Sequence, residues 1–275
     1  MSRVMYKFTI KTESSCFPLT MSGRPGKNWR NMRNLRLDIC YDGTRYRGWQ
    51  RLPGVENTIQ GKLETALSRI LSEPIEISGS GRTDAGAHAM HQIANFHCVS
   101  TMPAEEILEQ LRRYLPADIG IYSCQEASER FHARLNAKSK TYCYRIWNSR
   151  GPCVFENRFV SVEQRALDIP AMEQATKHLL GEHDFSAFCA AKSKTKSSVR
   201  RIDEIRIIRV DQEVRFLFTG NGFLYNMVRI LTGTLVEVGL HERTADSIPL
   251  LFDAKRSDTG KLMEAKGLCL LEVAY

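Results

Sequence analysis

The sequence predicts an α+β fold made of two ferredoxin-like halves, each with an antiparallel sheet. Two observations lead to this prediction. Segments between residues 35 and 124 follow the order strand, helix, strand, strand, helix, strand, which is the order of a ferredoxin-like unit. A looser version of this order follows residue 150. We therefore divide the chain into an N-terminal extension (1–33) that we expect to be disordered, a first half (34–150) and a second half (151–275).

The first half opens with Leu35–Tyr41, whose strict alternation of apolar and polar residues is typical of a half-buried strand. A helix follows, which Asn57 or Thr58 can cap and whose apolar residues recur at helical spacing. The remaining elements, in order, are strands at 75–78 and 92–99, a helix after Pro103, and strands at 119–124 and 140–147.

The second half begins after the Arg-Gly-Pro turn at 150–152. One of its helices carries an apolar stripe that includes Met227 and Val238, which is typical of a core-facing helix. Its elements are a helix at 170–180, strands at 202–210 and 213–218, a helix at 223–238 and a final strand at 268–274.

Composition and charge narrow the class of protein. Hydrophobic residues make up 43% and charged residues 25%, with a net charge of +8, which fits a soluble globular protein. The positive excess suits a polyanionic partner, although a solubilising surface explains it as well. No stretch approaches the roughly 20 apolar residues of a membrane span, so we expect no membrane association. The eight cysteines form no C-x-x-C pair, which indicates reduced thiols in a cytoplasmic protein.

The segment 79–89, with the sequence GSGRTDAGAHA, is the most informative of the chain. Its three glycines allow tight turns and the close approach of another molecule. The loop connects two predicted strands and places Asp84 where no bulky apolar residue buries it. Catalytic groups concentrate on loops of this kind, although a plain turn has a similar composition.

Three histidines near this loop raise the question of a metal site. His88, His91 and His97 lie close to Asp84 in the sequence. The segment after Met90 is predicted to be a strand, which turns successive side chains in different directions. Zinc needs three or four convergent ligands, and we therefore expect no metal.

Three further segments carry candidate functional residues. Phe131-His132-Ala133-Arg134 and the basic, tyrosine-containing run at 138–145 suit unpaired RNA bases and phosphates, or an ordinary strand with tyrosines on the sheet. Arg229 stands in an apolar helix, where it needs a partner or reaches out to solvent. A basic loop holds Lys192, Lys194, Lys196 and Arg200, either as a solvated run or as contacts to an RNA backbone.

In this order, these motifs closely resemble the TruA family of tRNA pseudouridine synthases. The loop Gly-Arg-Thr-Asp-Ala-Gly-x-His-Ala resembles the family's catalytic loop, and Phe-His-Ala-Arg followed by Tyr-x-Tyr resembles its second motif. Met-Val-Arg at 227–229 and Gly-Leu-x-Leu at 267–270 complete the pattern. The resemblance runs from Leu35 to the C-terminus.

The resemblance implies isomerisation of uridine to pseudouridine, without a cofactor, in the anticodon stem-loop of tRNA at positions 38, 39 or 40. It implies that the two sheets join into one larger sheet with a catalytic cleft between the halves, and that the enzyme is a homodimer that binds tRNA. Asp84 is then the essential carboxylate, acting as nucleophile or base, and Arg229 is its partner at hydrogen-bonding distance. Tyr142 stacks on the uracil. The remaining substrate-binding candidates are Arg82, Thr83, His88, His132, Arg134, Lys192, Lys194, Lys196 and Arg200.

Three alternatives stay open at this point. The same chemistry on another RNA, such as rRNA, is compatible with every motif. A non-catalytic RNA-binding protein of this fold is disfavoured because Asp84 and Arg229 are both present. A metal-dependent hydrolase built on the histidines would need further ligands.

Overall fold

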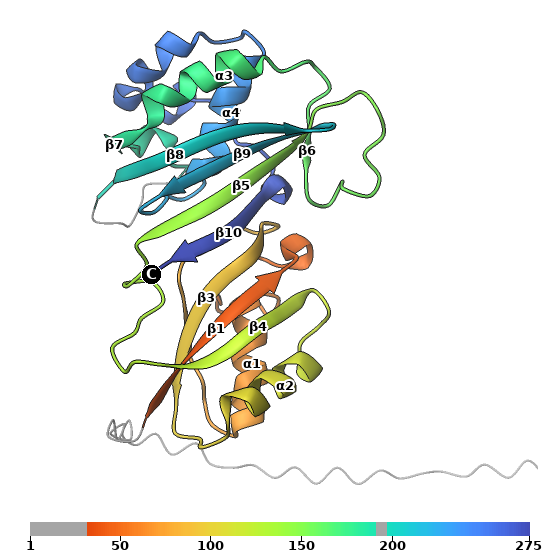
Figure 1. Cartoon of the computed structure of the whole chain (residues 1–275), viewed down its shortest axis with the longest axis vertical. Helices are drawn as coiled ribbons and strands as arrows, with labels where there is room; N and C mark the ends of the chain where they lie inside the picture. Colours follow the sequence, from red (N-terminus) through yellow and green to blue (C-terminus); the bar gives the residue numbers. More distant parts are fainter. Residues whose placement is uncertain (1–31, 191–196) are drawn as a thin grey trace, which may run out of the picture. The chain divides into compact units, whose positions relative to one another are not determined.

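The computed structural model describes residues 32–190 and 197–275 (Figure 1). The expected disorder of the N-terminal extension, up to residue 31, falls outside the described residues. Arg33 already belongs to the first strand. Lys192, Lys194 and Lys196 also lie outside the described residues.

Within the described residues, ten strands form a single sheet in the order β4-β1-β3-β10-β5-β9-β8-β7, with β2 paired to β3 and β6 paired to β5. The strands are β1 Arg33–Tyr41, β2 Ile77–Gly79, β3 His88–Cys98, β4 Ile119–Ala127, β5 Ser139–Trp147, β6 Ser161–Val162, β7 Gly181–Asp184, β8 Val199–Val210, β9 Glu213–Gly220 and β10 Leu268–Ala274.

Helices and short 3-10 turns connect these strands. The helices are α1 Ile59–Leu71, α2 Ala104–Tyr114, α3 Ile169–Thr176 and α4 Met227–Gly239. The 3-10 turns are Gly43–Arg45, Lys177–Leu179, Ser186–Phe188, Ala245–Asp253, Arg256–Asp258 and Ala265–Gly267.

The α+β class and the joining of two sheets into one are confirmed. Two units repeat the same order of elements: β1-α1-β2-β3-α2-β4 and β5-α3-β8-β9-α4-β10. In each unit the fourth strand lies beside the first, the first beside the third, and the third beside the second. The link between the units is β10, which pairs in parallel with β3 and antiparallel with β5 (Figure 1).

Strand β5 has its partners in the second unit. The predicted boundary near residue 150 counts it with the first half, yet it pairs with β9 along its whole length and with β10 on its other side. The division of the chain into domains at that boundary stays a prediction. Each unit has its own pair of helices, α1 with α2 and α3 with α4 (Figure 1).

One predicted strand and one predicted helix begin at the wrong residue, each by about four positions. Strand β3 begins at His88 rather than residue 92, because His88 and Ala89 pair with Cys269 and Leu270 of β10, far along the chain. Helix α4 begins at Met227 rather than residue 223, because Asn226 adopts a left-handed conformation with φ 62°. That conformation is incompatible with a continuous right-handed helix.

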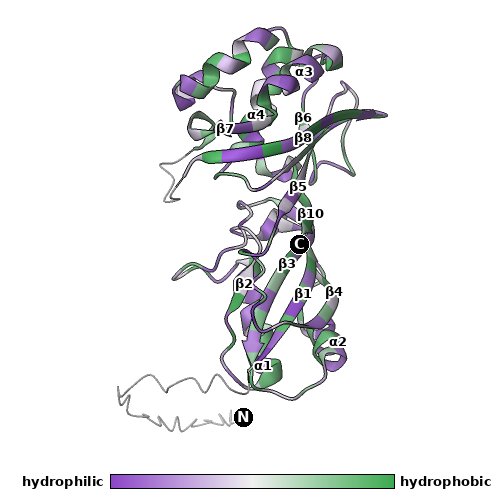
Figure 2. Cartoon of the chain, turned by 60° about the vertical axis from the view of Figure 1, so that its left-hand side comes forward, coloured by the Kyte–Doolittle hydropathy of each residue, from purple (hydrophilic) through white to green (hydrophobic). Residues whose placement is uncertain are grey.

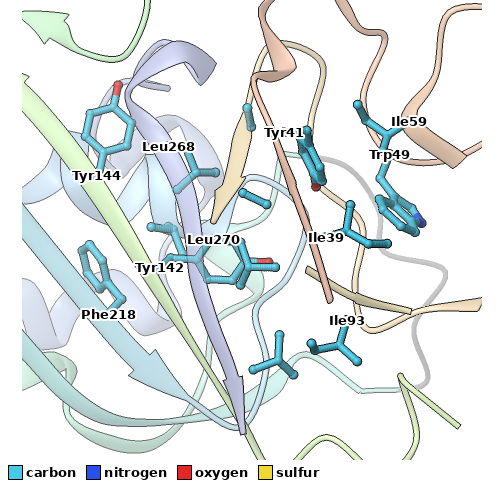
Figure 3. Packing of buried hydrophobic residues seen from close by; sticks show 14 of the residues in the cluster. Ile39, Tyr41, Trp49, Ile59, Ile93, Tyr142, Tyr144, Phe218, Leu268 and Leu270 are labelled. Carbon is cyan, nitrogen blue, oxygen red and sulfur yellow. The ribbon is translucent and has the colours of Figure 1, made fainter. Parts of the chain in front are cut away.

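The hydrophobic core follows the sheet through both units. Alternate residues of β1 are buried, and hydrophobic and hydrophilic residues mix along the strands in Figure 2. Tyr142 and Leu270 lie side by side on β5 and β10, close to Tyr41 and Trp49 of the first unit (Figure 3). The joint between the units is therefore packed with apolar side chains.

Candidate active site

The loop that carries Asp84 is fixed by backbone hydrogen bonds on both sides. It connects β2 to β3, and the Ser80 amide donates to the Ile93 carbonyl at 2.7 Å. The segment that follows β1 supplies the other contacts. Trp49 donates its backbone amide to the Thr83 carbonyl at 3.1 Å, and the Gly86 amide donates to the Tyr46 carbonyl at 3.3 Å. These bonds hold the Asp84 backbone in place without help from a ligand.

Two glycines allow these segments to interlock. A Cβ on Gly79 would lie 2.5 Å from the Trp49 indole, closer than real Cβ contacts allow. Gly48 has φ +90° and its Cβ would meet the Thr83 carbonyl at 2.7 Å. Glycine is therefore needed at both positions, once for space and once also for its left-handed backbone.

Asp84 and Arg229 meet across the two units. Arg229 Nη1 donates to Asp84 Oδ2 at 3.0 Å, and the side chains of Arg229 and Asp84 are only 12% and 16% exposed. Arg229 also donates to the Met263 carbonyl at 2.7 Å and to Asn226 Oδ1 at 2.8 Å. The expected hydrogen-bonding distance is confirmed. Three acceptors from three segments fix the guanidinium, and so fix the position of the charge beside Asp84.

Asn226 is a residue that sequence reasoning missed. Its left-handed backbone ends the preceding turn, and its side chain reaches Arg229 one helical turn ahead. Asparagine is one of the few residues other than glycine that adopt this conformation readily. The available signal was an asparagine directly before an apolar helix.

Tyr142 is buried on β5, with its ring edge-on to Phe223 at a centroid distance of 5.3 Å. Burial raises the pKa of the Tyr142 phenol well above its usual value, and the nearby negative charge of Asp84 raises it further. The phenol therefore keeps its proton at neutral pH. Its proximity to Asp84 brings the second motif to the catalytic loop.

Comparisons with known proteins identify the family to which the chain belongs. A family model described as tRNA pseudouridine synthase matches residues 39–136 and 175–275. The chain belongs to the TruA family of tRNA pseudouridine synthases. The family activity is the isomerisation of uridine to pseudouridine in tRNA, and the chain is an enzyme of this class.

The chain spans the whole length of its similar relatives. A "tRNA pseudouridine synthase A 2" of Bacillus cereus is 44% identical over 245 residues, covering 89% of this chain and 100% of that protein. A "tRNA pseudouridine synthase A" of Acetivibrio thermocellus has the same identity over 246 residues and the same coverage. A solved Cbf5-Nop10-Gar1 complex aligns over 86% of this chain and 48% of that chain with 12% identity and a TM-score of 0.36, which is too weak to inform the site.

The TruA-type loop also holds Arg82 and Thr83. The Thr83 hydroxyl is buried against the Tyr41 hydroxyl at 2.9 Å, so it braces the loop from inside. Arg82 is exposed and donates to Gln50 Oε1 at 3.0 Å. Gln50 in turn donates to Gln60 Oε1 at 2.8 Å. Gln50 was missed from the sequence, where it stands in an aromatic and basic loop that drew attention only as a whole.

His88 lies inside the fold rather than on its surface. Its side chain is buried, Nε2 donates to the Lys266 carbonyl at 3.2 Å, and Nδ1 accepts from the Gly43 amide at 3.1 Å. Burial lowers the pKa of His88, and the neighbouring Asp42 carboxylate only partly offsets this effect. A neutral ring with both nitrogens engaged favours a structural role over the predicted RNA contact, which stays untested.

The remaining RNA-binding candidates lie near the start of β5 and β8. His132 accepts from the Arg134 backbone amide at 3.1 Å, and the side chain of Arg134 is exposed. Arg200 is half-buried at the start of β8. In the part of the chain that the structure describes, no group of three or more His, Cys, Asp or Glu side chains is placed to hold a metal ion. No helix among these residues is long and apolar enough to span a membrane.

Proposed function

We propose that this enzyme forms pseudouridine in the anticodon stem-loop of tRNA, at positions 38, 39 or 40, with Asp84 as its catalytic carboxylate. The observation that supports the proposal is the contact between Asp84 and Arg229, in which one TruA motif from each unit meets within 3.0 Å. Tyr142, the aromatic residue of the Tyr-x-Tyr motif, borders the same loop, with its hydroxyl 3.9 Å from the place that a Cβ on Gly81 would take.

The reaction breaks the bond between N1 of uracil and C1′ of the ribose and forms a bond between C5 and C1′. The proton on C5 is released, and N1 ends with a proton. Asp84 acts either by adding covalently to the substrate or by taking a sugar proton. Arg229 serves both routes, because its guanidinium is fixed by three acceptors and holds the carboxylate in one position.

Tyr142 has a narrower role in this proposal. Because its phenol keeps its proton at neutral pH, stacking on the uracil suits it better than accepting the C5 proton. A uridine within a stem reaches such a ring only after it leaves the helix. Unstacking and unpairing cost a few kcal/mol, which contacts to the RNA backbone offset.

The direct test uses purified protein and tRNA transcripts. Wild-type protein should form pseudouridine at position 38, 39 or 40, and cytidine at these positions should abolish the product. Asp84→Asn should lower the single-turnover rate by about 10³-fold or more, while tRNA affinity changes little. Substantial turnover by Asp84→Asn would overturn the assignment of the carboxylate. Product only at other tRNA positions, or only in rRNA, would overturn the target.

We also propose that the enzyme is a cytoplasmic homodimer, with tRNA bound across both subunits. A single chain offers limited surface to a long RNA, and the resemblance to the TruA family supports a dimer. Light scattering on the purified protein at working concentration should give twice the mass of one chain, 31.4 kDa. A monomer that forms pseudouridine at full rate would contradict the dimer.

A further inference from the structure

Strand register brings three segments together at one end of the second unit. Lys140 at the start of β5 pairs with Gly220 at the end of β9, and Gly220 pairs with Ile202 of β8. Arg200 lies two residues before Ile202, and its side chain passes within 3.8 Å of the place that a Cβ on Gly222 would take. Arg134 comes from the loop that leads into β5.

Lys140 reaches from this corner to the catalytic loop. Its Nζ donates to the Ser80 carbonyl at 2.7 Å. A Cβ on Gly81 would lie 3.1 Å from this ammonium and 3.9 Å from the Tyr142 hydroxyl, so both groups border the same space above Gly81. Lys140 and Tyr142 are two residues apart on one strand, which turns both side chains to the same face.

No carboxylate neutralises this corner. Across residues 32–190 and 197–275, no Asp or Glu oxygen lies within 4.0 Å of a side-chain nitrogen of Lys140, Arg134 or Arg200. Many other arginines of the described chain have such a partner, Arg229 and Arg145 among them. Burial lowers the pKa of Lys140 to about 8, and the charges of Arg134 and Arg200 contribute to this shift. Strand register brings Arg200 to the corner where Lys140 lies, and Arg134 belongs to the loop that leads into β5.

We propose that Lys140, Arg134 and Arg200 together bind one backbone phosphate of the RNA, adjacent to the target uridine, with Lys140 as the innermost contact. The inference rests on the proposed function. A phosphodiester is the anion that an RNA substrate supplies next to every base, and it satisfies ammonium and guanidinium donors together. Because Lys140 borders the same space as Tyr142, the phosphate belongs to the nucleotide on that ring or to its immediate neighbour.

A double-mutant cycle between protein and RNA tests this site. Binding is measured in the Asp84→Asn background with anticodon stem-loops that carry a neutral methylphosphonate at one position at a time. At the contacted phosphate, the neutral linkage should weaken binding about tenfold. The same linkage should have a clearly smaller effect when Lys140→Gln is present, because one of the three cations that contact this phosphate is then missing. Arg134→Gln, at an exposed position that does not threaten folding, should show the same coupling at the same phosphate.

The control is Lys177→Gln, which removes the same charge from an exposed lysine in the 3-10 turn Lys177–Leu179. It should leave the full methylphosphonate effect at every position. The phosphate site would be overturned if, at every position, the methylphosphonate weakened binding by the same factor with and without Lys140→Gln or Arg134→Gln. Coupling only at phosphates remote from the target uridine would also overturn it. Because wild-type turnover is measured separately, a failed cycle with normal pseudouridine formation rejects this site and leaves the proposed function standing.

Discussion

The Asp84 centre and the basic corner, formed by Lys140, Arg134 and Arg200, differ in whether their charges are paired, although both border Tyr142. At the first, Arg229 already has three acceptors, including the carboxylate. At the second, Lys140, Arg134 and Arg200 each lack a carboxylate oxygen within 4.0 Å among the described residues. The difference indicates a division of labour. The catalytic carboxylate is positioned before RNA binds, whereas the three cations gain an anionic partner only when RNA binds.

This comparison has an energetic side. Pairing Asp84 with Arg229 avoids the cost of holding a lone carboxylate in a largely buried position. Gathering Lys140, Arg134 and Arg200 costs stability in the free protein, because like charges repel. Binding of a phosphate reverses this cost, so the repulsion becomes part of the affinity for RNA.

The largest expected effect comes from breaking the preorganised pair. Arg229→Leu should lower the single-turnover rate by about 10²-fold or more, because Asp84 loses its only cationic contact among the described residues. tRNA affinity should change less than about threefold, since the basic corner is intact. Rapid-quench measurement of pseudouridine formation, with filter binding in parallel, separates these outcomes.

A second variant guards against loss of the fold. Arg229→Lys keeps a charge but removes the fork of donors, and should recover part of the rate lost in Arg229→Leu. Circular dichroism melting reports whether each variant is folded. Equal rates for wild type and a folded Arg229→Leu would mean that preorganisation by this arginine has no catalytic value.

A substitution where the segment after β1 packs against the loop between β2 and β3 should have the next largest effect. Gly79→Ala pushes a Cβ into the Trp49 indole, so we expect a loss of about 1–3 kcal/mol in the free energy of unfolding. The rate should also fall, because the displaced loop carries Asp84. Gly151→Ala is the matched control, since its Cβ would meet only side-chain ends, at 3.3 Å or more. Similar urea midpoints for the two variants would contradict the steric argument.

Lys140 should make RNA affinity depend on pH. Its pKa of about 8 means that the ammonium loses its proton between pH 7 and 9, so binding by Asp84→Asn should weaken by up to about tenfold over this range. Phosphate binding favours the ammonium, which moves the midpoint above 8 in the complex. Arg134, Arg200, the Ser80 carbonyl and the Tyr142 phenol are the groups that face it, and burial raises the pKa of Tyr142 above this pH range. Lys140→Arg should remove this pH dependence.

The Lys140 contribution to the free energy of unfolding should rise with pH, whereas its contribution to RNA affinity should fall. Between about pH 8 and the usual lysine value of 10.5, the unfolded chain binds more protons at Lys140 than the folded chain does. The Lys140 contribution to stability therefore becomes more favourable as pH rises. Comparing urea midpoints of wild type and Lys140→Arg across this range isolates the contribution. A contribution of the opposite sign would mean that Lys140 has an anionic partner in the free protein.

The smallest expected effect concerns Arg82. Its contact with Gln50 orients the side chain but leaves it exposed, so Gln50→Leu should lower the single-turnover rate only about three- to tenfold. Stability should change by less than about 1 kcal/mol, as is usual for partly exposed polar side chains. A loss as large as that of Arg229→Leu would move Gln50 into the preorganised centre.

The sequence predicted those features of the site that depend on short motifs, and missed those that depend on contacts between distant segments. The contact of Asp84 with Arg229 was predictable because each residue stands in a long and specific motif. The burial of His88 was not, because a histidine in a glycine-rich loop looks exposed until β10 is placed beside it. Lys140 was visible only as one member of a basic run. Its importance comes from strand register, which pairs it with Gly220, eighty residues away.

The placement of β10 affects how the protein is made. Every other strand of the described residues precedes it in the sequence, yet it occupies the middle of the sheet, between β3 and β5. A ribosome therefore releases the first ferredoxin-like unit, and all of the second except its last strand, before the strand that joins them has emerged. Until then, β3 and β5 each expose an unpaired edge, which is a site for wrong pairing with another chain. The carboxylate and the arginine of the active centre come from the two units that this strand joins, so we expect their contact to form once β10 has paired with β3 and β5.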